Sequence, residues 1–201
     1  LSTNPVLQEH AQKNKGLAAR SAASADTLDL PFYDDFSDPV IVPRFDRWID
    51  TLTYINMDMA IAPPSYGVAT FDGLNGAGLA YNIANQNAYG VADYLTSAPI
   101  DLNYLPSDSV YLSFYYQMTG LGNAPEAEDS LVLEFQSPAD TLDWVHIWST
   151  PGDLPDTVFR SVYIPITDTT WLKRGFQFRF KNYATLSGNL DHWHVDYIIL
   201  D

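Results

Sequence analysis

Alternation of apolar and polar residues in three segments is the feature that most constrains how this chain can fold. In VYLSFYYQM at 110–118, SLVLEF at 130–135 and FQFRF at 176–180, every second residue is a large apolar one, and most residues between them are polar. Successive side chains of a β-strand point to opposite faces, so each segment offers one face to a core and one to water. Strands of this kind are typical of antiparallel sheets packed as a sandwich.

Weaker strand signals fill most of the remaining sequence between residues 28 and 201. Pro, Gly, Asn and Asp divide it into short apolar runs, and no alternation of strands with helices is present. We predict an all-β fold, a two-sheet antiparallel jelly-roll sandwich that occupies residues 28–201 as one domain. The additional strands are expected at 30–36, 45–49, 67–71, 91–96, 143–149, 157–165 and 192–200.

Residues 1–27 differ in composition from the rest of the chain. Their central part, 8–25, is rich in Ala, Lys and Gln, contains Gly16 and lacks Phe, Tyr and Trp. Helix formers interrupted by glycine predict an irregular or weakly helical leader segment. The chain starts at Leu1 without the apolar core of a signal peptide and ends directly after an apolar run, so we expect part of a longer protein.

Charge and cysteine content exclude several classes of function. The chain has 10 Lys and Arg against 25 Asp and Glu, for a formal net charge of −15, and it has no cysteine. An acidic surface repels phosphate backbones and anionic lipids, so we predict no nucleic-acid partner. Without cysteine the chain has no disulfide, thiolate metal site or cysteine nucleophile. No apolar stretch approaches the ~20 residues of a membrane span, so we predict no membrane insertion.

The acidic residues of the first and last strands suggest a calcium site. FYDDFSD at 32–38 carries Asp34 and Asp35, and the last strand carries Asp196. These two strands are often neighbours in jelly rolls, which would give one calcium ion several carboxylate oxygens. The alternative is that Asp34 and Asp35 bond to backbone groups or pair with an arginine, for which Arg44, Arg47 and Arg179 are the candidates.

The last strand, within DHWHVDYIILD at 191–201, also carries two histidines on one face. His192 and His194 are in phase with Asp196, an arrangement that can bind a transition metal. The alternative is a strand packed on both sides, in which hydrogen bonds satisfy these groups. A zinc site would need further ligands, and only His10 and His146 remain as histidines.

Tryptophans in the segment 143–149 suggest a surface for sugars. Trp144, His146 and Trp148 are expected to alternate onto one face of a strand. Indole faces stack on sugar rings, so Trp144 and Trp148 would form a stacking strip if they are exposed. The alternative is that both belong to the core, because large sandwiches bury tryptophan freely.

Catalytic patterns are weak in this sequence. There is no GxSxG elbow, no persuasive Ser/His/Asp order and no pair of carboxylates that stands out among the many. The glycine-rich run 71–82 has no basic residue and lacks the spacing of a phosphate-binding loop, so we interpret it as a tight loop. We therefore predict that these residues are not an enzyme.

Two long segments carry a family resemblance. DSVYLSFYYQMTGLGNAPEAEDSLVLEF at 108–135 and FQFRFKNYATLSGNLDHWHVDYIIL at 176–200 resemble a recurring domain of Bacteroidetes cell-surface proteins exported by the type IX secretion system. VDYI at 195–198, together with FYDDF at 32–36, is similar to the closing and opening strands of MAM-type and concanavalin-like jelly rolls. The resemblance implies a secreted or surface location, outside the outer membrane of a Gram-negative bacterium. It also implies a cation beside Asp196 and Asp34 or Asp35.

These observations favour a non-catalytic accessory or adhesion-type domain of an exported surface protein, stabilised by calcium. Its expected partner is a glycan or another surface or secretion protein. The alternative is a carbohydrate-binding module attached to a larger enzyme, and a metal-dependent hydrolase is a third hypothesis.

Overall fold

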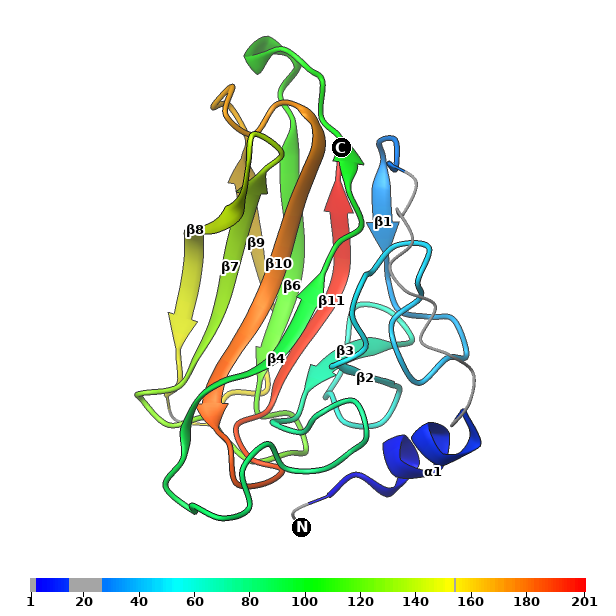
Figure 1. Cartoon of the computed structure of the whole chain (residues 1–201), viewed down its shortest axis with the longest axis vertical. Coiled ribbons are helices and arrows are strands. Elements are labelled where there is room, and N and C mark those ends of the chain that lie inside the picture. Colours follow the sequence, from blue (N-terminus) through cyan, green and yellow to red (C-terminus); the bar gives the residue numbers. More distant parts are fainter. Residues whose placement is uncertain (1–2, 15–26, 154) are drawn as a thin grey trace.

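Two antiparallel sheets lie face to face in the computed structural model, which describes residues 3–14, 27–153 and 155–201 (Figure 1). The six-stranded sheet has the order β2-β3-β11-β6-β9, with β1 also paired to β11, and the five-stranded sheet has the order β4-β10-β7-β8, with β5 paired to β10. The predicted all-β sandwich with a weakly helical N-terminal segment is confirmed. The strands are β1 (Phe32–Asp34), β2 (Tyr54–Asn56), β3 (Val68–Phe71), β4 (Tyr89–Thr96), β5 (Ile100–Asp101), β6 (Tyr111–Met118), β7 (Ser130–Ser137), β8 (Asp140–Pro151), β9 (Arg160–Pro165), β10 (Arg174–Thr185) and β11 (Trp193–Leu200).

The core lies between the sheets and is filled by aromatic side chains of the three most regular predicted strands. The rings of Phe114 in β6 and Phe180 in β10 meet edge to face with centroids 4.8 Å apart. Phe135 in β7 contacts Phe176 in β10 in the same way at 4.9 Å. All four side chains are buried. Burial of a large apolar side chain contributes about 1.5–3 kcal/mol, so these strands form the stable centre of the domain.

The prediction of a strand at 45–49 is wrong. The backbone N–H groups of Arg47 and Trp48 both donate to the carbonyl of Arg44, which makes a turn. Trp48 is fully buried and inserts its ring between residues of both sheets. The apolar residues of the segment 45–49 therefore belong to a loop that packs onto the core, and they do not indicate a strand. The short strands β2 and β5 were not predicted, because two or three residues carry no periodicity.

The N-terminal helix α1 (Pro5–Lys13) packs beside the glycine-rich loop. Asn4 caps it, since its side-chain oxygen accepts bonds from the N–H groups of Val6 and Leu7, and Pro5 begins the first turn. Leu7 is fully buried, which anchors the helix. The rest of the predicted leader, residues 15–26, lies outside the described residues. Within the described part of the chain, no helix is long and apolar enough to cross a membrane.

Candidate functional site

The first and last strands meet as the sequence predicted. β11 shares one edge between two partners, because β3 pairs with its first half and β1 with its second half (Figure 1). Asp196 lies where one partner ends and the other begins, and the register against β6 shifts directly after it. The junction therefore brings Asp196 to the region of Asp34 and Asp35, and the contacts of each carboxylate indicate what it does there.

Asp34 is a buried residue whose two carboxylate oxygens are both partnered. Its Oδ2 accepts a bond of 2.7 Å from the indole Nε1 of Trp48, and its Oδ1 accepts one from the N–H of Phe36. Arg47 lies 3.2 Å from Oδ1. Burial raises the pKa of Asp34, against the opposing effect of these donors. The backbone and arginine contacts match the alternative considered for this residue.

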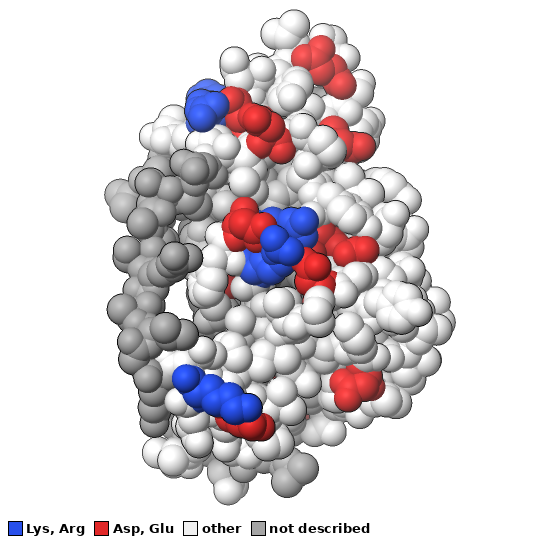
Figure 2. Space-filling model, turned by 90° about the vertical axis from the view of Figure 1, so that its right-hand side faces the viewer, with Lys and Arg blue, Asp and Glu red and all other residues white. Residues whose placement is uncertain are grey.

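Arginine side chains on the surrounding surface are also paired. Arg44 contacts Asp38 at 2.5 Å and Asp46 at 2.6 Å. Figure 2 shows this side of the molecule, where Lys and Arg form a few small groups next to Asp and Glu and most of the surface carries no charge. The positive charge visible on this face is therefore local and compensated.

Asp196 and Asp35 hold the loop that precedes β3. The N–H of Ser65 donates to Oδ2 of Asp196 at 2.9 Å, and the Ser65 hydroxyl lies 2.8 Å from its Oδ1. The Ser65 hydroxyl also lies 2.6 Å from the backbone carbonyl oxygen of Asp35, whose side-chain Oδ1 accepts a bond from the N–H of Ser37. Burial raises the pKa of Asp196 to about 6. Calcium binding at Asp34, Asp35 and Asp196 stays a prediction, and each of the three has partners within the protein.

The two histidines near the start of β11 are neutral groups that anchor a loop. Burial lowers the pKa of His192 to about 4 and that of His194 to about 3. His194 bonds through Nδ1 to the hydroxyl of Thr70 at 2.9 Å and through Nε2 to the carbonyl of Thr119 at 3.3 Å. Nδ1 of His192 accepts the N–H of Asn123 at 3.0 Å. Most ring nitrogens of the two histidines therefore have a hydrogen-bond partner within the protein.

Trp144 and Trp148 do not share a face, contrary to the prediction. A β-bulge interrupts the pairing of β8 with β7, so that Trp148 lies opposite the core residue Leu133 while His146 lies opposite Glu134 on the other face. Trp148 packs against Phe114 with ring centroids 5.3 Å apart. The extra residue of the bulge inverts the alternation, and a two-tryptophan stacking strip is therefore absent from β8.

Trp144 instead belongs to a cluster on the outer face of the five-stranded sheet. The guanidinium carbon of Arg179 lies 4.1 Å from the centroid of the Trp144 ring and 4.7 Å from that of Tyr94. Glu134 accepts a bond of 2.7 Å from Nε of Arg179 and a second bond from Nζ of Lys181. We call Tyr94, Glu134, Trp144, Arg179 and Lys181 the aromatic–cationic face. Glu134 is buried and the other four residues are half-buried, and the two cations lower the pKa of Glu134 against the effect of burial.

A buried pair of aspartates that the sequence did not single out fixes the glycine-rich loop. Asp93 is fully buried and accepts bonds from the N–H of Gly73 at 2.9 Å and the hydroxyl of Tyr81 at 3.1 Å. Asp72 is bonded by the side chain of Asn4. Burial raises the pKa of both aspartates, that of Asp72 to about 6. Their bonds run to structural groups, so they are assigned to the stability of the loop.

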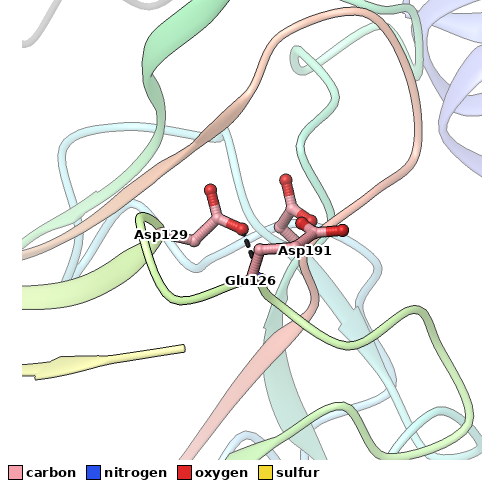
Figure 3. Close-up of side chains that lie close together, drawn as sticks. All are labelled: Glu126, Asp129 and Asp191. Carbon is pink, nitrogen blue, oxygen red and sulfur yellow. Dashed lines mark hydrogen bonds between the residues drawn. The ribbon is translucent and has the colours of Figure 1, made fainter. Parts of the chain in front are cut away.

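A second acidic group was also missed. Glu126, Asp129 and Asp191 each offer a carboxylate oxygen, and these atoms lie within 4.8 Å of one another (Figure 3). It is the only group of three such ligands among the residues that the structure describes. Asp191 precedes the last strand by two positions and was not among the predicted ligands, and Glu126 and Asp129 lie in a loop to which no function was assigned.

Known structures share the fold but little sequence. The K2 cleaved adhesin domain of Lys-gingipain superposes with a TM-score of 0.55 at 14% identity, over 86% of this chain and 98% of that one. The K1 cleaved adhesin domain of Lys-gingipain from Porphyromonas gingivalis W83 gives 0.47 at 12% identity, over 85% and 97% of the two chains. The C-terminal family 22 carbohydrate-binding module of Clostridium thermocellum Xyn10B gives 0.48 at 10% identity, over 84% and 90%.

Sequence comparison adds no relative. No protein-family model matches the chain, and no curated protein is similar to it in sequence. At 14% identity the similarity to the K2 domain concerns the fold, so what these comparisons establish for this chain is a β-sandwich of the kind seen in that adhesin domain.

Proposed function

We propose that this chain is a non-catalytic, adhesion-type binding domain of an exported bacterial surface protein, and that it binds glycans through the aromatic–cationic face. The observation that carries the proposal is the position of Arg179, held between the rings of Trp144 and Tyr94 on the outer face of the sheet. The likeness of the fold to the K2 adhesin domain supports the general class. The Bacteroidetes origin and the type IX secretion route belong to the proposal and come from the sequence resemblance.

The chemistry of the aromatic–cationic face suits a sugar. Aromatic rings stack on the apolar faces of sugar rings, and charged groups held in place bond strongly to hydroxyl oxygens. Glu134 lies between Arg179 and Lys181, so acceptor and donor groups alternate over a short distance. A glycan that displaced part of these internal bonds would find both kinds of partner.

The sheet also keeps these side chains in position. β10, which carries Arg179 and Lys181, is paired with β7 on one side and with β4 on the other. Side chains on a strand with two partners lose little further freedom on binding, which reduces the entropic cost of recognition. Trp144 comes from the edge strand β8 and is braced by Arg179.

The test is a glycan array followed by titration of any hit against the wild-type chain and two variants. Trp144→Ala should weaken binding at least tenfold, because the stacking surface is lost. Tyr163→Ala is the matched control, since Tyr163 is an exposed aromatic residue on β9 of the other sheet and should leave affinity unchanged. Undiminished binding by Trp144→Ala would refute the assignment of this face, and a chain that binds no glycan would refute the ligand class.

The second hypothesis, a carbohydrate-binding module of a larger enzyme, uses the same face. The two hypotheses differ in what the rest of the gene should encode. A downstream catalytic domain would favour the module, and a sorting domain without a catalytic domain would favour the surface adhesin.

A further inference from the structure

Glu126, Asp129 and Asp191 form an acidic cluster at the end of the sandwich where β11 begins. Glu126 and Asp129 lie in the loop between β6 and β7, and Asp191 lies in the loop between β10 and β11 (Figure 3). Asp129 and Asp191 are only 1% and 2% exposed, whereas Glu126 is exposed. The cluster therefore has a buried base and one side open to solvent.

One buried oxygen of this cluster lacks a hydrogen-bond partner. Oδ2 of Asp129 accepts the N–H of Glu126 at 2.6 Å, but its Oδ1 is buried without a donor. Oδ2 of Asp191 accepts the N–H of Thr185 at 2.9 Å. Among the described residues, no Lys or Arg forms an ion pair with any of the three carboxylates. A buried carboxylate oxygen without a partner is costly, and like charges nearby add to that cost.

We propose that Glu126, Asp129 and Asp191 bind a calcium ion. Calcium takes carboxylate and carbonyl oxygens at about 2.3–2.6 Å, so oxygens on opposite sides of one ion are about 5 Å apart. The three carboxylate oxygens lie within 4.8 Å of one another and fit around one such ion. No histidine is part of the group, so its ligands are all hard oxygens, which favours calcium over zinc. The open side at Glu126 leaves room for the water ligands that calcium retains.

The loops around the cluster are held in place without a metal. The N–H of His192 donates to the carbonyl of Asn123 at 3.0 Å, and the N–H of Asn123 returns a bond to His192. The N–H of Gly152 donates to the carbonyl of Asp129 at 2.9 Å. Gly122 lies flat on the imidazole of His192, where a Cβ would be 2.2 Å from Cγ. The folded chain thus presents the three carboxylates together, and an ion would tie the β6–β7 loop to β11.

Calcium binding is tested by melting the full chain in calcium chloride and in EDTA and by calorimetric titration with calcium. A ligand that binds only the folded state at a concentration about a hundredfold above its Kd should raise the Tm by roughly 5–10 °C. Asp129→Asn and Asp191→Asn should abolish both the shift and the binding heat. In EDTA, Asp129→Asn should melt no lower than the wild type, because it removes charge repulsion and keeps the shape of the side chain.

Asp35→Asn and Asp196→Asn are the matched controls, because these residues belong to the separate calcium prediction at the first and last strands. Both should keep the calcium response. The proposal is overturned if the wild type shows neither a Tm shift nor binding heat at 10 mM calcium. It is also overturned if Asp129→Asn and Asp191→Asn keep the response, or if only Asp35→Asn and Asp196→Asn lose it.

Discussion

Replacement of Trp48 by phenylalanine should destabilise the domain through one hydrogen bond and one cavity. Trp48 is fully buried, and its ring contacts Phe32 and Phe178 edge to face with centroids 5.2 and 5.8 Å apart. Its Nε1 donates a bond of 2.7 Å to the buried carboxylate of Asp34. Trp48→Phe removes this donor and part of the indole volume while it keeps an aromatic ring in the same place.

The magnitude follows from these two losses. A buried acceptor that loses its donor costs about 1–3 kcal/mol, and the smaller ring leaves a cavity that costs about 1 kcal/mol more. The free energy of unfolding should therefore fall by about 2–4 kcal/mol. For a chain of this length about 1 kcal/mol corresponds to 2–4 °C, so the Tm should fall by roughly 10 °C.

Urea denaturation followed by tryptophan fluorescence and by circular dichroism measures the change. The midpoint should fall with an unchanged slope, since the unfolded chain exposes the same surface. Trp171→Phe is the control: Trp171 is half-buried at the edge of the core and has no indole bond of this kind among the described contacts, so its loss should cost less than about 1 kcal/mol. A double-mutant cycle of Trp48→Phe with Asp34→Asn should give a coupling of about 1–3 kcal/mol. A cost below about 0.5 kcal/mol with no coupling would refute the reasoning.

Three further predictions concern stability. Trp148→Ala should lower the free energy of unfolding by about 2–4 kcal/mol because Trp148 packs on the core, whereas Trp144→Ala should cost less than about 1 kcal/mol; equal costs in chemical denaturation would contradict the bulge in β8. Gly122→Ala should cost at least about 2 kcal/mol because its Cβ would overlap the ring of His192, and a wild-type Tm would contradict this packing. Burial raises the pKa of Asp72 to about 6 and raises that of Asp93 as well, so the contribution of these groups to stability is complete below their ordinary pKa of 3.8 and is lost as the pH rises through their folded pKa values. His192 and His194 act in the opposite direction, because burial lowers their pKa values to about 4 and about 3, so the aspartate contribution has to be measured by comparison with a variant. In EDTA the Tm of Asp93→Asn relative to that of the wild type should rise from pH 5 to pH 8, and a difference that stays constant would contradict the reasoning.

The fold could be predicted because apolar and polar residues alternate in its central strands. In β10, Phe176, Phe178 and Phe180 are buried and most residues between them are more exposed, and β6 alternates in much the same way. The sequence of β7 alternates too, although nearly all of its residues are buried. The failure at 45–49 has a physical reason, because Trp48 is buried from a turn and gives its segment the composition of a strand. The composition of a segment indicates that its side chains are buried, but it does not indicate whether the backbone there is a strand or a turn.

The sites were harder to predict because they depend on register and on contacts distant in sequence. One extra residue in β8 places Trp144 on the outer face and Trp148 on the inner one, and no residue in the segment marks that bulge. The acidic cluster joins Asp129 to Asp191 across two loops. The signal that could have found it is the concentration of acidic residues in the loop 119–129, which also contains Gly120 and Gly122.

The polar residues at the start of β11 made this strand a candidate site in the sequence. The sequence did not show which group each of these residues contacts. Asp191, His192, His194 and Asp196 are all buried, and each bonds to another part of the chain. Asp191 bonds to the end of β10, and Asp196 bonds to the loop that precedes β3. Both histidines bond to the β6–β7 loop, and His194 also bonds to β3. Because a buried polar group without a partner costs about 1–3 kcal/mol, each bond stabilises its loop against the strand. Asp191 differs from the other three because two further carboxylates lie beside it. A protein donor accounts for the position of the others, whereas the cluster at Asp191 concentrates negative charge that the described residues leave uncompensated, which is why a cation is expected there.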